Sequence, residues 1–152
     1  MKNKKYIILE IIPTAVNPKD GEVAQISALK IDGIKLEDRF DYRLEEDKIN
    51  NYDIIRMISY DKDDFIYVNT TRKIMTRFKK WISDYDLLII DNLYTRNYLK
   101  NIKNKKESIF DYLDLELSDD VIDKMMKKYN LQPSNHIVDL LYEAIIANGN
   151  KK

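Results

Sequence analysis

The chain has 152 residues and no cysteine, which excludes disulfide bonds, zinc sites built on thiolates and a cysteine nucleophile. Lysine and arginine together number 26, as do aspartate and glutamate, so the formal net charge is zero. A protein whose main task is to grip phosphates usually carries a basic excess, and this balance lowers the expectation of nucleic-acid binding without excluding it. The length and the hydrophobic share of 44% fit one globular domain, which we expect to span residues 1–148 with a short tail at 149–152.

The first residues place lysines before an apolar run, as a signal peptide does. Glu10 interrupts this run and Pro13 follows soon after it, which argues against export. No stretch reaches the apolar length that a membrane span requires. We therefore expect a cytoplasmic protein without a membrane partner.

Three strands are expected in the first third of the chain. Lys5–Ile12 is short, apolar and rich in isoleucine, and Val23–Ile31 alternates between apolar and polar residues. Turn-forming residues at 17–21 separate these two strands. Phe40–Leu44 would complete an antiparallel meander, and a short helix is expected near Asp61–Ile66.

A helix at Thr71–Ile82, with Thr71 as its N-cap, opens the second part of the chain. Leu87–Ile90 is apolar without alternation, which is typical of a strand buried on both faces. A helix at Thr95–Lys103 and a short strand at Ser108–Tyr112 follow.

Two more helices are expected near the end of the chain. Ser118 would cap the first, and either Ser134 or Asn135 would begin the second, which ends at about Ala147. This order of elements predicts an α/β fold with a mixed sheet. Many families share such an order, so it does not by itself indicate a function.

Four segments carry a more specific pattern. They are ILEIIPTAVNPKDGEVAQISALKIDG at 8–33, LLIIDNLYTRNYLKNI at 87–102, SIFDYLDL at 108–115 and LQPSNHIVDLLYEAI at 131–145. In order and spacing they resemble the motifs of the DEDDh (DnaQ-like, proofreading-type) 3′–5′ exonucleases over most of the chain. The resemblance implies a ribonuclease H-like mixed sheet, with three antiparallel strands plus parallel strands, flanked by helices.

The same resemblance implies a particular chemistry. Members of that family hold two divalent metal ions with four carboxylates, and a histidine acts as general base. A hard, strongly hydrated ion such as Mg²⁺ needs a dense set of carboxylate and phosphate oxygens.

This chain departs from the family pattern at most of those positions. Glu10 falls where the family has its first Asp, and Ile12 falls where it has Glu. Arg96 replaces the second motif's Asp, and Ser134 replaces the catalytic histidine. Asp139 matches the last metal-binding Asp. The remnant catalytic positions are therefore Glu10 and Asp139.

Two further residues bear on the same site. His136 is the chain's one histidine and lies two positions beyond the family's base, about 200° around a helix, so it would point away from the site unless the helix begins in a loop-like form. Asp91 stands where the family has the histidine of a His-Asn pair. An unpaired carboxylate in an apolar strand is costly, so we expect Arg96 to hydrogen-bond to Glu10, to Asp139 or to both as a bridge.

Three functions follow from these departures. The first is an inactive exonuclease-like module that binds single-stranded nucleic acid or a protein partner and needs no metal. The second is an altered but active nuclease that uses Mg²⁺ or Mn²⁺ through Glu10, Asp91 and Asp139. The third is a protein-interaction accessory factor with no role on nucleic acid.

Overall fold

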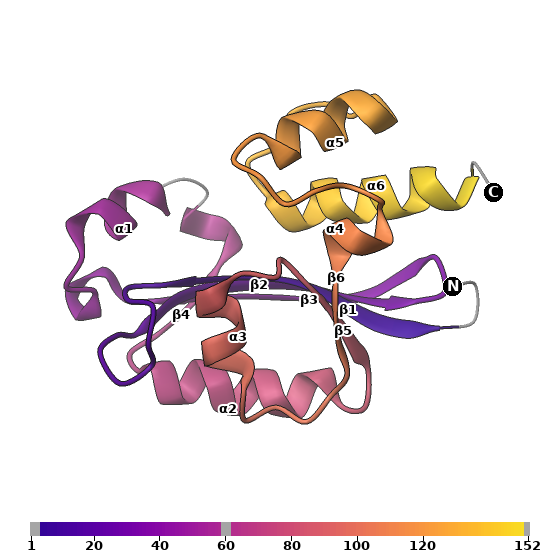
Figure 1. The fold of residues 1–152 in the computed structure, drawn as a ribbon. Coiled ribbons are helices and arrows are strands. Elements are labelled where there is room, and N and C mark those ends of the chain that lie inside the picture. The colour runs from indigo at the N-terminus through magenta and orange to yellow at the C-terminus, as the bar shows by residue number, and fades with distance from the viewer. Residues whose placement is uncertain (1–3, 59–61, 151–152) are drawn as a thin grey trace.

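The computed structural model describes residues 4–58 and 62–150, without the side chain of residue 150. Its centre is a six-stranded sheet in the order β4-β3-β2-β1-β5-β6, with helices on both faces (Figure 1). The strands are β1 (Lys5–Pro13), β2 (Val23–Asp32), β3 (Lys35–Leu44), β4 (Ile66–Val68), β5 (Asp86–Ile89) and β6 (Lys106–Ser108). The helices are α1 (Tyr52–Met57), α2 (Thr71–Ile82), α3 (Leu93–Leu99), α4 (Ile109–Tyr112), α5 (Val121–Tyr129) and α6 (Ile137–Asn150). Two short 3-10 turns, η1 (Glu46–Lys48) and η2 (Lys62–Asp64), complete the described elements.

The sheet is mixed, as the sequence predicts. β1 pairs antiparallel with β2, and β2 pairs antiparallel with β3. On the other side of β1, β5 runs parallel to it, and β6 runs parallel to β5. The predicted α/β sheet, with β1 in its interior between an antiparallel and a parallel neighbour, is confirmed.

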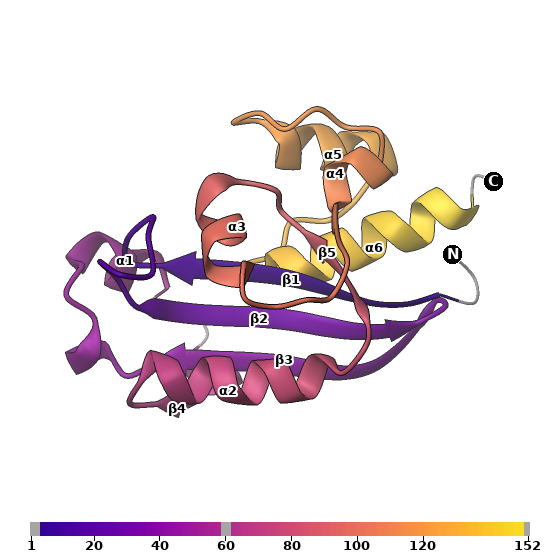
Figure 2. The same ribbon diagram turned by 60° about the horizontal axis from the view of Figure 1, so that its bottom comes forward.

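Both faces of β1 are covered, which explains its nearly continuous apolar sequence. Ile7, Leu9 and Ile11 belong to the core beneath α2 and α3. Tyr6 and Ile8 belong to the core beneath α4, α5 and α6. Figure 2 shows α2 lying along β3 on the first of these faces, with α6 on the other. None of the described helices has the length and apolar content needed to cross a membrane.

The region between β3 and α2 differs from expectation. β3 begins at Lys35 rather than Phe40. The residues from Lys35 to Arg39 are all exposed, so they lack the alternation that predicts a strand from sequence. The helix expected near Asp61–Ile66 is a 3-10 turn followed by β4, and Asp61 lies outside the described residues. Helix α1 was not predicted. The side chain of Asn51 caps it by accepting a hydrogen bond from the backbone N–H of Ile54.

Two helix starts also differ from the prediction. Thr70, not Thr71, caps α2, and its side chain accepts a hydrogen bond from the N–H of Lys73. α3 begins at Leu93, two residues early, because Asn92 caps it, and it ends at Leu99.

The two C-terminal helices begin a few residues later than the sequence predicts. Asp120 stands at the N-cap of α5, while Ser118 donates a hydrogen bond to the Asp120 carboxylate. The strand expected at Ser108–Tyr112 is wrong beyond its first residue, because α4 begins at Ile109. α6 begins at Ile137 and continues to residue 150.

Candidate functional site

Glu10 stands near the end of β1 on the face covered by α6. It lies opposite Ser27 of β2, which in turn lies opposite Asp41 of β3. Directly opposed residues share a face, so these three polar side chains form one row across the sheet. The Glu10 side chain is half-buried, and no described residue hydrogen-bonds to its carboxyl group. Burial raises the pKa of Glu10 to about 7, because the charged form loses hydration that no partner replaces.

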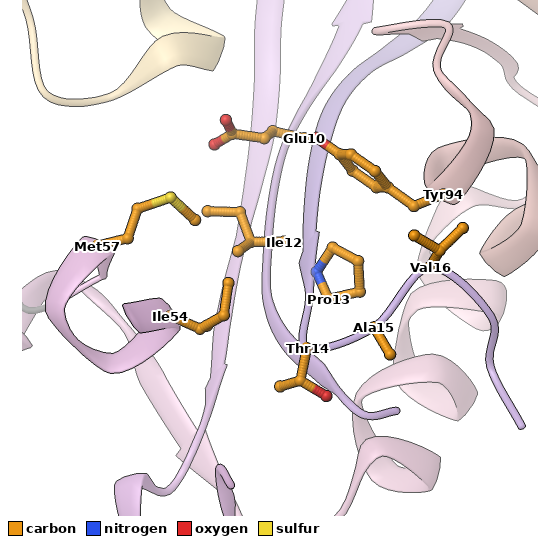
Figure 3. A pocket seen from close by; sticks show the side chains of 9 residues that line it. All are labelled: Glu10, Ile12, Pro13, Thr14, Ala15, Val16, Ile54, Met57 and Tyr94. Carbon is orange, nitrogen blue, oxygen red and sulfur yellow. The ribbon is translucent and has the colours of Figure 1, made fainter. Parts of the chain in front are cut away.

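Ile12 follows Glu10 and points to the same side of β1 (Figure 3). It is 8% exposed and belongs to the apolar core. The position where the family resemblance implies a second carboxylate therefore lies in an apolar environment. Burying a carboxylate there would be costly unless a cation paired with it.

Arg96 does not meet Glu10 or Asp139, so the predicted bridge is wrong. Its guanidinium donates two hydrogen bonds to Asp91, with Nε 2.6 Å from Oδ1 and a terminal nitrogen 2.9 Å from Oδ2. The hydrogen bonds from Arg96 lower the pKa of Asp91. Both residues line a polar depression at β6 and α4, and neither lines the cleft beside Glu10. The cap at Asn92 places Arg96 in the first turns of α3, within reach of the aspartate five residues before it.

Asp139, in the first turn of α6, is held by an arginine from β3. Arg39 donates to Asp139 at 2.7 Å and 3.4 Å, and its Nε donates to Asp41 at 3.0 Å. The side chains of Arg39 and Asp139 are 38% and 34% exposed, so solvent screens this pair in part. A guanidinium therefore holds Asp139, but it belongs to Arg39 and not to Arg96, and Glu10 gains no such partner among the described residues. Sequence analysis missed Arg39 because it lies 100 residues from Asp139 and just outside the strand that the pattern predicted.

Ser134 and His136 lie in the turn before α6. The Ser134 hydroxyl oxygen accepts a hydrogen bond from the backbone N–H of His136 at 3.1 Å. The imidazole Nε2 of His136 lies 3.2 Å from Asp64 of η2, and the ring stacks on Phe65. These contacts turn the histidine toward η2.

A buried polar pair that the sequence did not reveal lies beside this turn. Arg43 of β3 is only 1% exposed, and it donates two hydrogen bonds to the Gln25 side-chain oxygen, at 2.9 Å and 2.5 Å. Its guanidinium also lies over the Phe65 ring, 3.8 Å from the centroid. Gln25 pairs with Ile12 on one side and Arg43 on the other, so this pair forms a second row, next to the row of Glu10, Ser27 and Asp41.

An open cleft of about 420 Å³ lies at the end of β1, and Glu10 is the one charged residue among the described residues that line it. Figure 3 shows Glu10 above Ile12, with Ile54 and Met57 of α1 on one side and Tyr94 and Val16 on the other. The lining residues are Glu10, Ile12, Pro13, Thr14, Ala15, Val16, Ile54, Met57 and Tyr94. Sequence analysis missed the wall formed by α1, since it predicted no helix there.

Two residues of α3 hold the loop at 14–21, which borders the cleft, through hydrogen bonds to its backbone. The Tyr98 hydroxyl of α3 donates to the Ala15 carbonyl oxygen at 2.9 Å, and the Asn97 amide donates to the Val16 carbonyl oxygen at 3.1 Å. At Gly21 a Cβ atom would lie 2.7 Å from the Ala15 Cβ and 2.9 Å from the Tyr98 hydroxyl. Glycine at this position therefore lets the loop pack closely against α3.

This mixed sheet, with its central strand ending at a cleft and helices on both faces, is a ribonuclease H-like α/β fold. The chain is similar over 95% of its length to a product-bound structure of exonuclease I, with a TM-score of 0.58 at 11% sequence identity. It is also similar to exonuclease I from E. coli in complex with a dT13 oligonucleotide (TM-score 0.57, 12% identity, 99% of this chain). A third similar structure is a complex named ExoI/SSB-Ct (TM-score 0.58, 12% identity, 96% of this chain).

The chain spans about two fifths of exonuclease I, with 42%, 41% and 40% of those three chains covered. No protein-family model matches it, and no curated protein sequence does. At this level of identity the similarity establishes the fold.

The family resemblance implies divalent metal ions, and the residues present do not fit them. Among residues 4–58 and 62–150, no three Asp, Glu or His side chains gather closely enough to hold a metal ion. Of the four carboxylate positions, Ile12 and Arg96 supply no oxygen ligand, and Asp139 is occupied by Arg39. Of these four positions, only Glu10 offers a carboxylate that no arginine holds.

Proposed function

We propose that this chain is a degenerate exonuclease-like domain that does not hydrolyse nucleic acid and that binds a partner at the cleft beside Glu10. The observation that carries this proposal is the separation of the two remnant acids. Asp139 is hydrogen-bonded to Arg39, while Glu10 stands alone beside the apolar Ile12.

The side chains around Glu10 and Asp139 do not favour the two-metal chemistry of active family members. Two-metal hydrolysis needs carboxylates that hold both ions and a base that activates water. Glu10, with its pKa near 7, is only partly ionised at neutral pH, which makes it a poor ligand for a hard cation. We therefore propose that the domain needs neither Mg²⁺ nor Mn²⁺.

The general base is also missing from the arrangement. Ser134 occupies the family's histidine position, and its hydroxyl oxygen accepts a hydrogen bond from the backbone. His136 is engaged with Asp64 and Phe65. Without a base or a metal ion, the phosphodiester transition state would lack the stabilisation on which such catalysis depends.

Binding, in contrast, needs only the cleft. Its walls come from β1, the loop after it, α1 and α3, so the fold retains a concave surface where the carboxylates are gone. The similar exonuclease I structures include complexes with single-stranded DNA and with SSB. Either class of partner is compatible with a retained binding role.

The test is a cleavage assay on fluorescently labelled 3′-tailed DNA and RNA in the presence of Mg²⁺ or Mn²⁺. We expect the wild-type chain to degrade no more substrate than the Glu10→Gln variant. Metal-dependent cleavage by the wild type that Glu10→Gln abolishes would contradict the proposal and favour an altered nuclease. The Glu116→Gln variant, which changes an exposed carboxylate outside the cleft, is the matched control.

A further inference from the structure

The chemistry of the cleft beside Glu10 indicates which kind of partner it fits. Apart from Glu10, the described side chains that line it are uncharged, and most are apolar. Two of them, Val16 and Met57, are also large exposed apolar residues. Exposed apolar side chains gathered around a concavity are typical of a surface that a partner covers.

The charge of the cleft argues against a phosphate-bearing ligand. Among residues 4–58 and 62–150, no lysine or arginine lines it, so the described walls offer the backbone of a nucleic acid no counter-charge. Two basic residues of α2, Arg77 and Lys80, line a different depression together with Asp38 and Asp41. A carboxylate without a partner attracts a cation or a hydrogen-bond donor.

We propose, building on the binding role above, that the cleft takes a protein segment that presents a large apolar side chain next to a lysine or arginine. The apolar side chain packs against Ile12, Ile54 and Met57. The cationic group lies on the Glu10 carboxylate. Aromatic and methionine side chains are enriched where proteins bind one another, and Tyr94 and Met57 supply both kinds here. The volume of about 420 Å³ lies toward the small end of ligand pockets, which suits one or two side chains.

The proposal is tested with short blocked peptides and with nucleotides, at pH 8 so that Glu10 is mostly ionised. The peptides are Gly-Trp-Lys-Gly, its charge-reversed match Gly-Trp-Glu-Gly, and Gly-Ala-Lys-Gly, which lacks the apolar side chain. Thymidine 5′-monophosphate and an oligothymidylate are the nucleic-acid probes. Carbon-13 methyl NMR of isoleucine and methionine follows binding, because Ile12, Ile54 and Met57 report on the cleft itself.

We expect the Trp-Lys peptide to shift these three methyl signals and to bind about fivefold tighter than the Trp-Glu peptide, as a partly exposed ion pair allows. The Glu10→Gln variant should bind both peptides about equally. The Met57→Ser variant should weaken binding of both, whereas Leu117→Ser, which changes an exposed apolar side chain outside the cleft, should not.

Equal binding of the two tryptophan peptides by the wild type would overturn the proposed role of Glu10. Stronger shifts with either nucleic-acid probe would identify the cleft as a nucleotide site, and an absence of shifts with all peptides would exclude the proposed partner. The cleavage assay is independent of these results, so a failure of peptide binding is distinguishable from a failure of the proposed lack of hydrolysis.

Discussion

Replacing Glu10 with glutamine should stabilise the protein at alkaline pH. The substitution keeps the shape of the side chain and removes a charge that is poorly hydrated in the folded state. Burial raises the pKa of this carboxyl from 4.5 to about 7. One pKa unit corresponds to about 1.4 kcal/mol, so the ionised group destabilises the folded state by at most about 3.5 kcal/mol.

The pH dependence has a definite direction. Below pH 4.5 the carboxyl is protonated in both the folded and the unfolded chain, and it imposes no penalty. Between pH 4.5 and about 7 the unfolded chain ionises while the folded chain stays protonated, so the stability of the wild type falls. Above pH 7 both states are ionised and the penalty stays constant. The advantage of Glu10→Gln should therefore grow from pH 5 to pH 7 and level off near pH 8.

Urea unfolding of the wild type and the variant at intervals between pH 5 and pH 8 measures this difference directly. Comparing the two proteins at each pH cancels the titration of every other group. The Glu116→Gln variant repeats the chemical change at an exposed position and serves as control. A difference that stays flat across this range, or a variant that is less stable than the wild type at pH 8, would refute the reasoning about Glu10.

Two further predictions concern the surroundings of the cleft. Gly21→Ala should destabilise the protein by about 1–3 kcal/mol, because the new methyl group overlaps Ala15 in a tightly packed loop, whereas Gly149→Ala, with open space around it, should not. Thermal unfolding of the two variants checks this, and equal melting temperatures would contradict it. Arg39→Ala should cost about 1 kcal/mol, since Asp139 loses its partner, and the loss should shrink in high salt. A loss in urea unfolding that does not depend on salt would show that the ion pair is not its cause.

The strands that form the core could be predicted because their residues carry the signal locally. The apolar run in β1 and the one in β5 each reflect burial on both faces, which short sequence windows reveal. The assignment of Glu10 and Asp139 as remnant positions, and of Ile12 as a replaced one, rests on motif spacing and stays a prediction. Elements with exposed or short sequences were missed, among them α1 and the first half of β3, because neither shows an apolar period.

The sequence alone places no acid at positions 12 and 96, which the family resemblance assigns to two of the four metal-binding carboxylates. Only the tertiary structure decided which cation meets which acid. Arg96 reaches the nearby Asp91, and Arg39 meets Asp139 across 100 residues because the sheet brings β3 beneath the start of α6. Ion pairs depend on which side chains come within a few ångströms of each other, and chain distance carries little information about that. The apolar cleft beside Glu10 likewise exists only in the tertiary structure, because its walls come from four separate segments.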